Sequence, residues 1–140
     1  MNRQARYRRR RRFSLIEIMV VLLIIGLLGA LVAPKAINKL KKAKRQTAKV
    51  QIRLLANAAK DYYLDMDQFP DSLEDMVRNP GGEKWDGPYL EPAKIPNDPW
   101  DNEYHYEAPG QDGRDFDIVS YGADNAPGGE GDNADIVSWE

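Results

Sequence analysis

A run of 21 largely apolar residues, 13–33, constrains the fold of this chain more than any other feature. It follows five consecutive arginines and ends at Pro34. As a helix, the run would extend about 31 Å at about 1.5 Å per residue, which is enough to cross the hydrocarbon core of a bilayer. We therefore predict a basic leader over residues 1–12 and a transmembrane or assembly helix over residues 13–34.

Glu17 is the one charged residue in this run. A carboxylate near the middle of a bilayer costs on the order of 3 kcal/mol, and charged residues in such segments are usually functional. The alternative is that Glu17 lies close enough to the end of the segment to reach the lipid headgroups. Seven arginines precede the run and eight basic residues follow it up to Arg53, so charge bias does not fix its orientation.

A secretory signal is an alternative interpretation of the N-terminus, which has a basic start, an apolar core and small residues near Ala33. The apolar core is long for such a signal, and residues 31–33 make a poor cleavage site. This alternative predicts a secreted protein that begins near residue 34.

Charge divides the chain into two halves. Residues 1–60 contain 16 Lys and Arg and one acid, for a net charge of +15, whereas residues 61–140 contain 4 basic and 21 acidic residues, for −17. Such asymmetry indicates either an ordered assembly, in which one half of a subunit meets the other half of its neighbour, or an anionic domain on a cationic stalk without direct contact.

Residues 35–66 have the pattern of an amphipathic helix that ends near Met66. The apolar residues that recur every three or four positions predict one continuous face: Ile37, Leu40, Ala43, Thr47, Val50, Leu54, Ala58 and Tyr62. Lysines and arginines occupy another face. A basic stripe is compatible with nucleic acid or a membrane surface, but it lacks the interleaved aromatic residues of nucleic-acid binders. We expect the basic face to meet solvent or a neighbouring subunit.

The rest of the chain has the signals of a small α+β domain. A short helix is predicted over residues 73–78, capped by Asp71 or Ser72, followed by an ordered proline-rich loop over residues 79–99. Four residues are expected to pin this loop to the core: Trp85, Tyr89, Leu90 and Ile95. Residues 103–107 and 116–121 predict a β-hairpin, and residues 136–139 predict a third strand. The predicted globular domain spans residues 35–140, with a long helix packed on a small antiparallel sheet.

The sequence resembles the type IV pilin-like superfamily, and within it the major pseudopilins of type II secretion. The N-terminal signature is Phe13-Ser14-Leu15-Ile16-Glu17 after a basic leader, and Pro34 matches the family's helix kink. In the outer domain, residues 96–106 and 116–124 match the loop and hairpin motifs of the G-type subunit. Asp101 stands where the family commonly has glycine. The resemblance implies a type IV pilin-like fold that ends in a C-terminal loop.

The resemblance also implies a maturation and assembly chemistry. A prepilin peptidase would cleave before Phe13 and methylate the new amine, and Glu17 would pair with the N-terminal amine of an adjacent subunit to set the register. Such a pair makes chemical sense because a buried carboxylate needs a cationic partner. The cleavage point departs from the family: Arg12 replaces the glycine before it, and we expect this arginine to impair processing.

The chain has no cysteine, which excludes disulfides, thiol catalysis and thiolate metal sites. A small exported domain usually needs some other staple. Residues 124–135 gather carboxylates on a glycine-rich loop, where hard oxygen donors suit calcium, although a solvated acidic turn is the alternative. By resemblance to the calcium-binding loop of major pseudopilins, the ligands would be Asp124, Asp132, Asp135, Asn133 and the carbonyl of Tyr121.

The function implied by the resemblance is that of the major structural subunit of the type II secretion pseudopilus. The chain would be a single-pass inner-membrane protein with its C-terminal domain in the periplasm, where it polymerises with itself to drive folded proteins through the outer-membrane secretin. Further implied partners are minor pseudopilins, the prepilin peptidase and the inner-membrane assembly platform, but not nucleic acid.

Three other functions are compatible with parts of the sequence. One is a minor pilin-like subunit of a type IV pilus or DNA-uptake filament, and another is a secreted calcium-binding module. The third is an enzyme anchored by an uncleaved helix. We expect no enzyme, because the lone His105 has no identifiable nucleophile or acid partner in the sequence.

Overall fold

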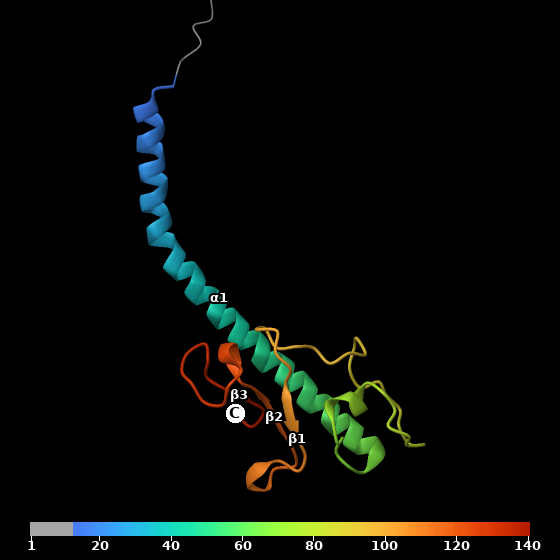
Figure 1. The fold of residues 1–140 in the computed structure, drawn as a ribbon. Helices are drawn as coiled ribbons and strands as arrows, with labels where there is room; N and C mark the ends of the chain where they lie inside the picture. Colours follow the sequence, from blue (N-terminus) through green and yellow to red (C-terminus); the bar gives the residue numbers. More distant parts are fainter. Residues whose placement is uncertain (1–12) are drawn as a thin grey trace, which may run out of the picture. The chain divides into compact units, whose positions relative to one another are not determined.

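The structure is a computed structural model that describes residues 13–140 (Figure 1). Arg12 and the rest of the predicted leader lie outside the described residues. The chain separates into two compact units that divide between Lys39 and Leu40, and each unit is described by itself. The domain boundaries predicted at residues 12 and 34 stay predictions.

One helix, α1 (Leu15–Met66), contains both predicted helical segments, and Pro34 lies inside it. At its start, the Ser14 carbonyl accepts hydrogen bonds from the amides of Glu17 and Ile18, at 3.0 and 3.3 Å. Large apolar side chains of the first unit are exposed throughout residues 15–28. By length and composition, α1 can cross a membrane, and it is the one helix within residues 13–140 that can do so.

The end of α1 at Met66 agrees with the prediction. The next residue, Asp67, has a φ of 58°, and its amide donates to the Tyr63 carbonyl at 2.9 Å. A residue in this left-handed conformation commonly ends a helix, because it turns the chain while still satisfying a carbonyl of the last turn. Pro70 follows shortly after and cannot continue the helix.

A 3-10 helix, η1 (Leu73–Met76), occupies the place of the short helix predicted over residues 73–78, and it ends two residues earlier. Ser72 is its N-cap, as expected, and the Ser72 amide donates to the Asp75 carboxylate at 3.0 Å. Leu73 and Met76 are buried, so this single turn contributes two side chains to the core.

The buried side of α1 in the second unit is a different stripe from the predicted apolar face. Five residues spaced three or four apart form a buried stripe on the helix: Ala48, Ile52, Leu55, Ala59 and Tyr62. Of the eight residues predicted to share one apolar face, only Ala58 and Tyr62 are buried, whereas Leu40, Val50 and Leu54 are 46–60% exposed. The last residues of the predicted face are spaced four apart, and each such step moves the face about 40° around the helix axis. The predicted face therefore reaches the buried side of α1 only at its C-terminal end.

Three short strands form one antiparallel sheet in the order β1-β2-β3, which confirms the predicted hairpin and third strand. They are β1 (His105–Glu107), β2 (Asp117–Ser120) and β3 (Ile136–Val137). His105 pairs with Val119, which pairs in turn with Val137. Two further 3-10 turns are η2 (Gln111–Gly113), in the hairpin connection, and η3 (Gly122–Asp124), after β2.

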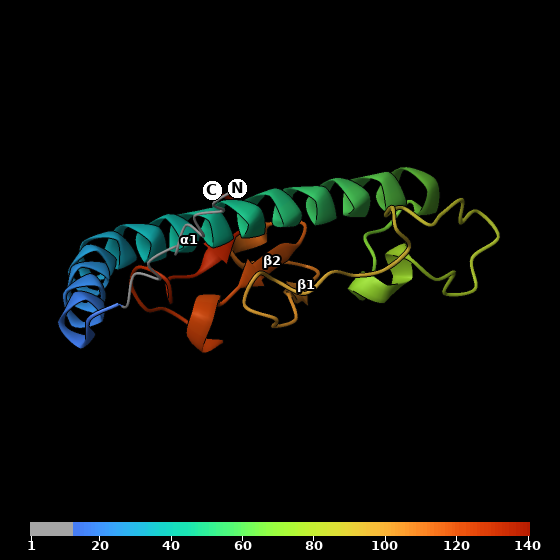
Figure 2. The same cartoon turned by 90° about the horizontal axis from the view of Figure 1, so that it is seen from above.

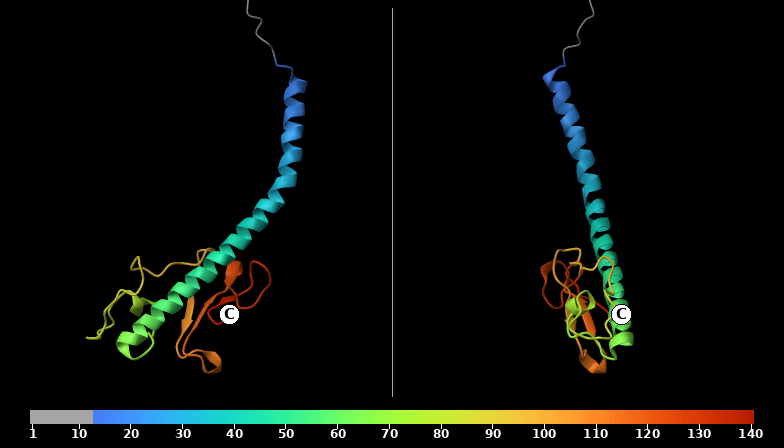
Figure 3. Two further views of the ribbon diagram at one scale, coloured as in Figure 1. Left: turned by 180° about the vertical axis from the view of Figure 1, so that it is seen from behind. Right: turned by 90° about the vertical axis from the view of Figure 1, so that its right-hand side faces the viewer.

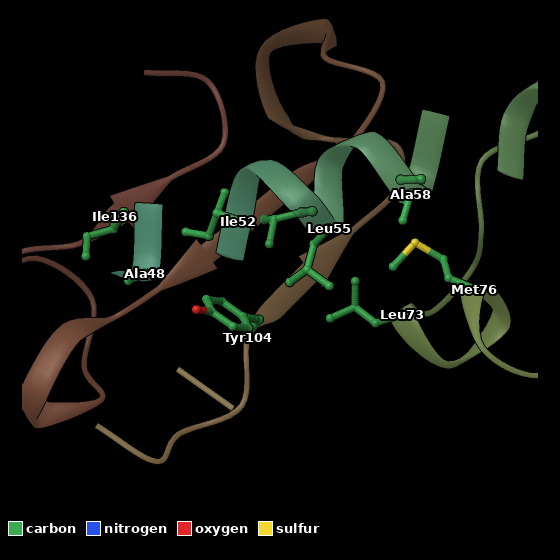
Figure 4. Packing of buried hydrophobic residues seen from close by; sticks show 10 residues of the cluster. Ala48, Ile52, Leu55, Ala58, Leu73, Met76, Tyr104 and Ile136 are labelled. Atoms are coloured by element: carbon green, nitrogen blue, oxygen red, sulfur yellow. The ribbon is translucent and has the colours of Figure 1, made fainter. Parts of the chain in front are cut away.

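The sheet, η1 and the connecting loops lie along one side of the second half of α1 (Figures 2 and 3). Ile118 and Ile136 point from the sheet into the contact with the helix and are 0% and 2% exposed. Tyr104, which precedes β1, packs beside Leu55 (Figure 4). Two of the five residues in the buried stripe are alanines, whose small side chains add little bulk on the buried side of α1.

The proline-rich stretch 79–99 contains no helix or strand, as predicted. The amide of Tyr89 donates to the Met76 carbonyl at 2.8 Å, and the Trp85 indole donates to the Asp75 carbonyl at 2.9 Å. The side chains of Tyr89, Leu90 and Ile95 pack against the core. These contacts confirm an ordered loop that its aromatic and aliphatic residues hold in place.

Candidate assembly helix and C-terminal loop

The two predicted assembly residues lie at the start of the chain that the structure describes. Phe13 precedes α1 and its side chain is 75% exposed, and Glu17 is an exposed residue of the first helical turn. Within residues 13–140, none of the ion pairs includes Glu17. A carboxylate near the positive end of the helix dipole is favourable in an isolated helix, and it stays available to a cation from outside the chain.

The C-terminal loop, residues 124–135, closes on η3 through backbone contacts. The amide of Ala123 donates to the Asp132 carbonyl at 3.0 Å, and the amide of Asn133 donates to the Glu130 carbonyl at 3.2 Å. Gly122 has a φ of +70°, and a Cβ there would lie 2.7 Å from the Asp132 carbonyl oxygen. The loop therefore passes so close to residue 122 that only glycine fits, and this contact closes it without a disulfide.

The predicted calcium ligands lie on or beside this loop, but the structure does not gather them around one centre. Asp124 accepts a hydrogen bond from the Ala126 amide at 3.3 Å, and both carboxylate oxygens of Asp135 lie 3.0 Å from the Gly128 amide. Tyr121 is the N-cap residue of η3. Within residues 13–140, no group of three or more His, Cys, Asp and Glu side chains could hold a metal ion as placed.

Asp132 is the predicted ligand whose surroundings fit a cation. One carboxylate oxygen, Oδ1, is buried without a hydrogen-bond partner, and the other lies 3.9 Å from Lys41 Nζ. A buried carboxylate oxygen without a partner is costly, because it has lost water and gained nothing in exchange. The donor set of the loop, all oxygen, fits calcium chemically.

Basic residues of α1 reach the C-terminal loop of their own subunit. Arg45 Nη1 donates to the Gly131 carbonyl at 2.9 Å and to the Ala134 carbonyl at 2.7 Å. Together with the ion pair between Lys41 and Asp132, these bonds contradict the hypothesis that the cationic stalk and the anionic domain make no direct contact. The available signal was spacing: residues 41 and 45 continue the buried stripe of α1 toward the N-terminus by the same steps of three and four.

A buried carboxylate, Asp98, fixes the loop before β1, and sequence reasoning missed it. Its Oδ1 accepts hydrogen bonds from the amides of Trp100 and Asn102, at 3.0 and 2.9 Å, and its Oδ2 accepts the Ser120 hydroxyl at 2.6 Å. Asp98 thus ties the loop to strand β2. The sequence signal that could have pointed to Asp98 was its position within Pro96–Trp100, which is part of the family's loop motif.

A second charged contact stiffens the hairpin. Arg114 donates to both carboxylate oxygens of Asp117, at 2.6 and 3.0 Å, and its guanidinium lies 4.1 Å from the centroid of the Trp139 ring. The Arg114 hydrogen bond holds the pKa of the Asp117 carboxyl below its usual range. Elsewhere in the core, burial raises the pKa of the Tyr104 phenol, whose hydroxyl donates to Gln51 at 2.7 Å.

Comparison with known protein families agrees with the fold described above. The family model described as type II secretion system protein G matches residues 35–139, and the model of the prokaryotic N-terminal methylation motif matches residues 8–33. The chain belongs to the type II secretion system protein G family. The predicted resemblance to major pseudopilins is therefore confirmed.

Individual members of the protein G family align with nearly the whole chain. The type II secretion system core protein G of Pseudomonas aeruginosa is 43% identical over 137 residues, covering 91% of this chain and 94% of that protein. The core protein G of Xanthomonas campestris pv. campestris is 40% identical over 124 residues, covering 88% of this chain and 85% of that protein.

A solved major pseudopilin has a similar fold. The crystal structure of the major pseudopilin from the type 2 secretion system of enterohaemorrhagic Escherichia coli matches with a TM-score of 0.57 and 30% sequence identity. The match covers 74% of this chain and 92% of that one. It confirms the predicted type IV pilin-like class, a long helix with a small antiparallel sheet.

Membership of the protein G family also bears on the predicted functions. Proteins of this family are structural subunits of a secretion system. The match therefore does not favour the hypothesis of an anchored enzyme or that of a subunit of a different filament. The methylation motif and the apolar start of α1, together with membership of the protein G family, indicate a membrane-anchored protein with a periplasmic part.

Proposed function

We propose that this chain is the major structural subunit of a type II secretion pseudopilus. The observation that carries this proposal is the continuity of two features in one chain: an N-terminal methylation motif over residues 8–33 joins a protein G domain over residues 35–139. Copies of the chain would polymerise in the periplasm, and the growing filament would drive folded proteins through the outer-membrane secretin. The role is structural, and it needs no catalytic centre.

The proposed assembly begins with a single-pass precursor in the inner membrane, whose C-terminal domain lies in the periplasm. The prepilin peptidase would remove residues 1–12 and methylate Phe13. Glu17 would then pair with the new amine of an adjacent copy, which would supply a cation to a carboxylate that makes no ion pair within residues 13–140. The assembly platform, minor pseudopilins and the secretin would be the other partners, with no role for nucleic acid.

The mature N-terminus and the filament test this proposal together. The chain is produced in cells that hold the secretion machinery, sheared filaments are imaged by electron microscopy, and the subunit N-terminus is measured by mass spectrometry. We expect filaments whose subunits begin at methylated Phe13, and none from the Glu17→Gln variant. Gln46→Glu, an exchange at an exposed polar position of α1, is the control and should assemble.

Two outcomes would contradict the proposal. A protein that begins at residue 34 or 35 would be a secreted module, and a protein that keeps its leader would be an anchored one. The variant Arg12→Gly separates a processing defect from a wrong function, because it restores the family's residue at the cleavage point. If Arg12 slows cleavage, this variant should increase the mature fraction.

We also propose that calcium binds the C-terminal loop. Asp124, Asp132, Asp135, Asn133 and the Tyr121 carbonyl would hold the ion, whose charge would offset the repulsion among the carboxylates of the loop. The unpartnered Oδ1 of Asp132 supports this proposal. When bound, calcium would supply a cross-link between the two ends of the loop, in the place of a disulfide.

Calcium titration of the full chain in detergent tests this binding. At a free calcium concentration about a hundred times Kd, stabilisation of about 2.7 kcal/mol should raise the Tm of the globular unit by on the order of 10 °C. Asp132→Asn should remove most of this shift, and magnesium should produce little of it. An unchanged Tm at millimolar calcium would exclude the site.

A further inference from the structure

Arg45 holds the C-terminal loop at the two points that flank a pair of predicted calcium ligands. Its Nη1 donates to the carbonyls of Gly131 and Ala134, at 2.9 and 2.7 Å, and residues 132 and 133 lie between those carbonyls. The two bonds come from one nitrogen of a planar, permanently charged group, so together they fix the distance between the ends of this short stretch.

Lys41, one turn earlier on α1, contacts the same stretch through its side chain. Its Nζ lies 3.9 Å from Asp132 Oδ2. Within the described residues, Arg45 makes the only hydrogen bonds between α1 and residues 124–135, and the Lys41 ion pair is the only salt bridge between them. The other polar contacts of the loop are to η3 or within the loop itself.

We propose that Arg45 is a positioning residue that holds residues 131–134 against α1 and thereby presents Asp132 and Asn133 to a cation. The hold itself consists of direct hydrogen bonds from the guanidinium of Arg45 to the two carbonyls. The consequence for the cation rests on the calcium binding proposed above.

The geometry also assigns different tasks to main chain and side chains in this stretch. The carbonyls of Gly131 and Ala134 point to the guanidinium, and a positively charged donor keeps a second cation away from the same oxygens. The carboxylate of Asp132, with a buried and unpartnered oxygen, is left for the metal. A loop already closed by Arg45 loses less conformational freedom when the ion binds, which increases the affinity.

Hydrogen exchange of the full chain in detergent, with calcium removed by a chelator, tests the hold. In Arg45→Met, the amides of residues 124–135 should exchange on the order of tenfold faster than in the unchanged protein, because hydrogen bonds to a charged donor are among the stronger ones. Arg53→Met is the matched control: Arg53 is exposed on the same helix and makes none of the contacts with the loop. It should leave the exchange of the loop unchanged.

The sheet provides an internal reference for this experiment. The amides of β2 should exchange at the same rate in both variants, since a positioning role concerns the loop alone. Unchanged exchange of residues 124–135 in Arg45→Met would overturn the proposal. So would faster exchange in the loop and the sheet together, because that pattern indicates a general loss of stability.

Calorimetric calcium titration of the same variants then separates this inference from the calcium proposal. If the unchanged chain binds calcium, Arg45→Met should raise its Kd about tenfold and Arg53→Met should not change it. Equal Kd values in all three would overturn the part of the proposal that concerns ligand presentation. If the unchanged chain binds no calcium, the calcium site and ligand presentation both fail, whereas local loosening in Arg45→Met would still establish the hold.

Discussion

Asp98 shows how one buried carboxylate can organise a loop. It is 4% exposed and accepts from two amides and the Ser120 hydroxyl. Asp98→Ala leaves three donors without a partner, and we expect it to lower the free energy of unfolding by about 3 kcal/mol. Urea denaturation followed by tryptophan fluorescence measures this, because all three tryptophans lie in the second unit.

The control for Asp98 is Glu103→Ala, an acid removed from an exposed position of the same segment. It should change the free energy of unfolding by less than about 0.5 kcal/mol. Equal effects of the two exchanges would mean that the hydrogen bonds of Asp98 contribute nothing particular to stability.

Asp101 carries backbone strain in the turn after Trp100. Its φ is 72°, a conformation that an L-residue adopts at a cost and glycine adopts freely. We expect Asp101→Gly to raise the free energy of unfolding by about 0.5–1 kcal/mol, although it removes an exposed contact between Asn97 and the Asp101 carboxylate. Asp101→Ala keeps the strain and loses the contact, so it should destabilise the protein. Thermal unfolding of both variants decides whether strain dominates.

The ion pair of Asp117 and Arg114 predicts acid sensitivity. The hydrogen bond from Arg114 lowers the pKa of Asp117 in the folded protein below its ordinary value of 3.8. Its contribution to stability is therefore complete above that ordinary value, and it is lost as the pH falls through the lower folded pKa. Between pH 5 and pH 2, the Tm of Asp117→Asn should fall less steeply than that of the unchanged protein. Asp115→Asn, at an exposed neighbouring position, should follow the unchanged curve.

At the scale of elements, α1 has two apolar stripes with different tasks. Leu55 is fully buried against the sheet, whereas Leu54, about 100° around the helix, is 57% exposed. We expect Leu55→Ala to cost about 3 kcal/mol of unfolding free energy and Leu54→Ala less than about 0.5 kcal/mol. Urea denaturation of the two variants measures both changes in the free energy of unfolding. Similar losses at the two positions would mean that the second unit packs on both stripes.

Local signals in the sequence were enough to predict the elements, but not the face on which they pack. The end of α1, the cap at Ser72, the hairpin and the third strand each depend on a few neighbouring residues. The choice between two stripes of one helix depends on contacts with residues far along the chain. The larger leucines and valines pointed to the exposed stripe, whereas the fully buried alanines at 48 and 59 mark the side that packs on the core.

The C-terminal loop shows the same limit at the candidate site. Its acidic composition and the absence of cysteine were enough to predict a loop in need of a cation. The cation that the structure shows there is Arg45, which lies 86 residues before Gly131 in the chain. Asp98 was missed for a similar reason, since its partner Ser120 lies 22 residues further on. Because the two residues of each pair lie far apart in the sequence, no pattern within a short segment predicts either contact.

At the scale of the whole molecule, some basic residues of the cationic half contact the anionic half within the same subunit. Lys41 and Arg45 of the cationic half contact the C-terminal loop of the anionic half. Other basic residues of the same helix remain exposed, among them Lys42, Lys49 and Arg53. Exposed charges of this kind can meet acidic surfaces of neighbouring copies, and salt would weaken such contacts over distances of about 8–10 Å.

The exposed stripe of α1 gives the last prediction, which concerns the filament. Leu40, Val50 and Leu54 are 46–60% exposed in the single chain, and their apolar surface gains about 25 cal/mol per Å² when a neighbouring helix covers it. Leu54→Glu places a charge on this stripe without entering the core. We expect unchanged tryptophan fluorescence and urea denaturation, but no filaments by electron microscopy. Gln46→Glu adds the same charge at an exposed polar position and should still assemble; filaments from Leu54→Glu would show that the stripe lies outside the subunit contacts.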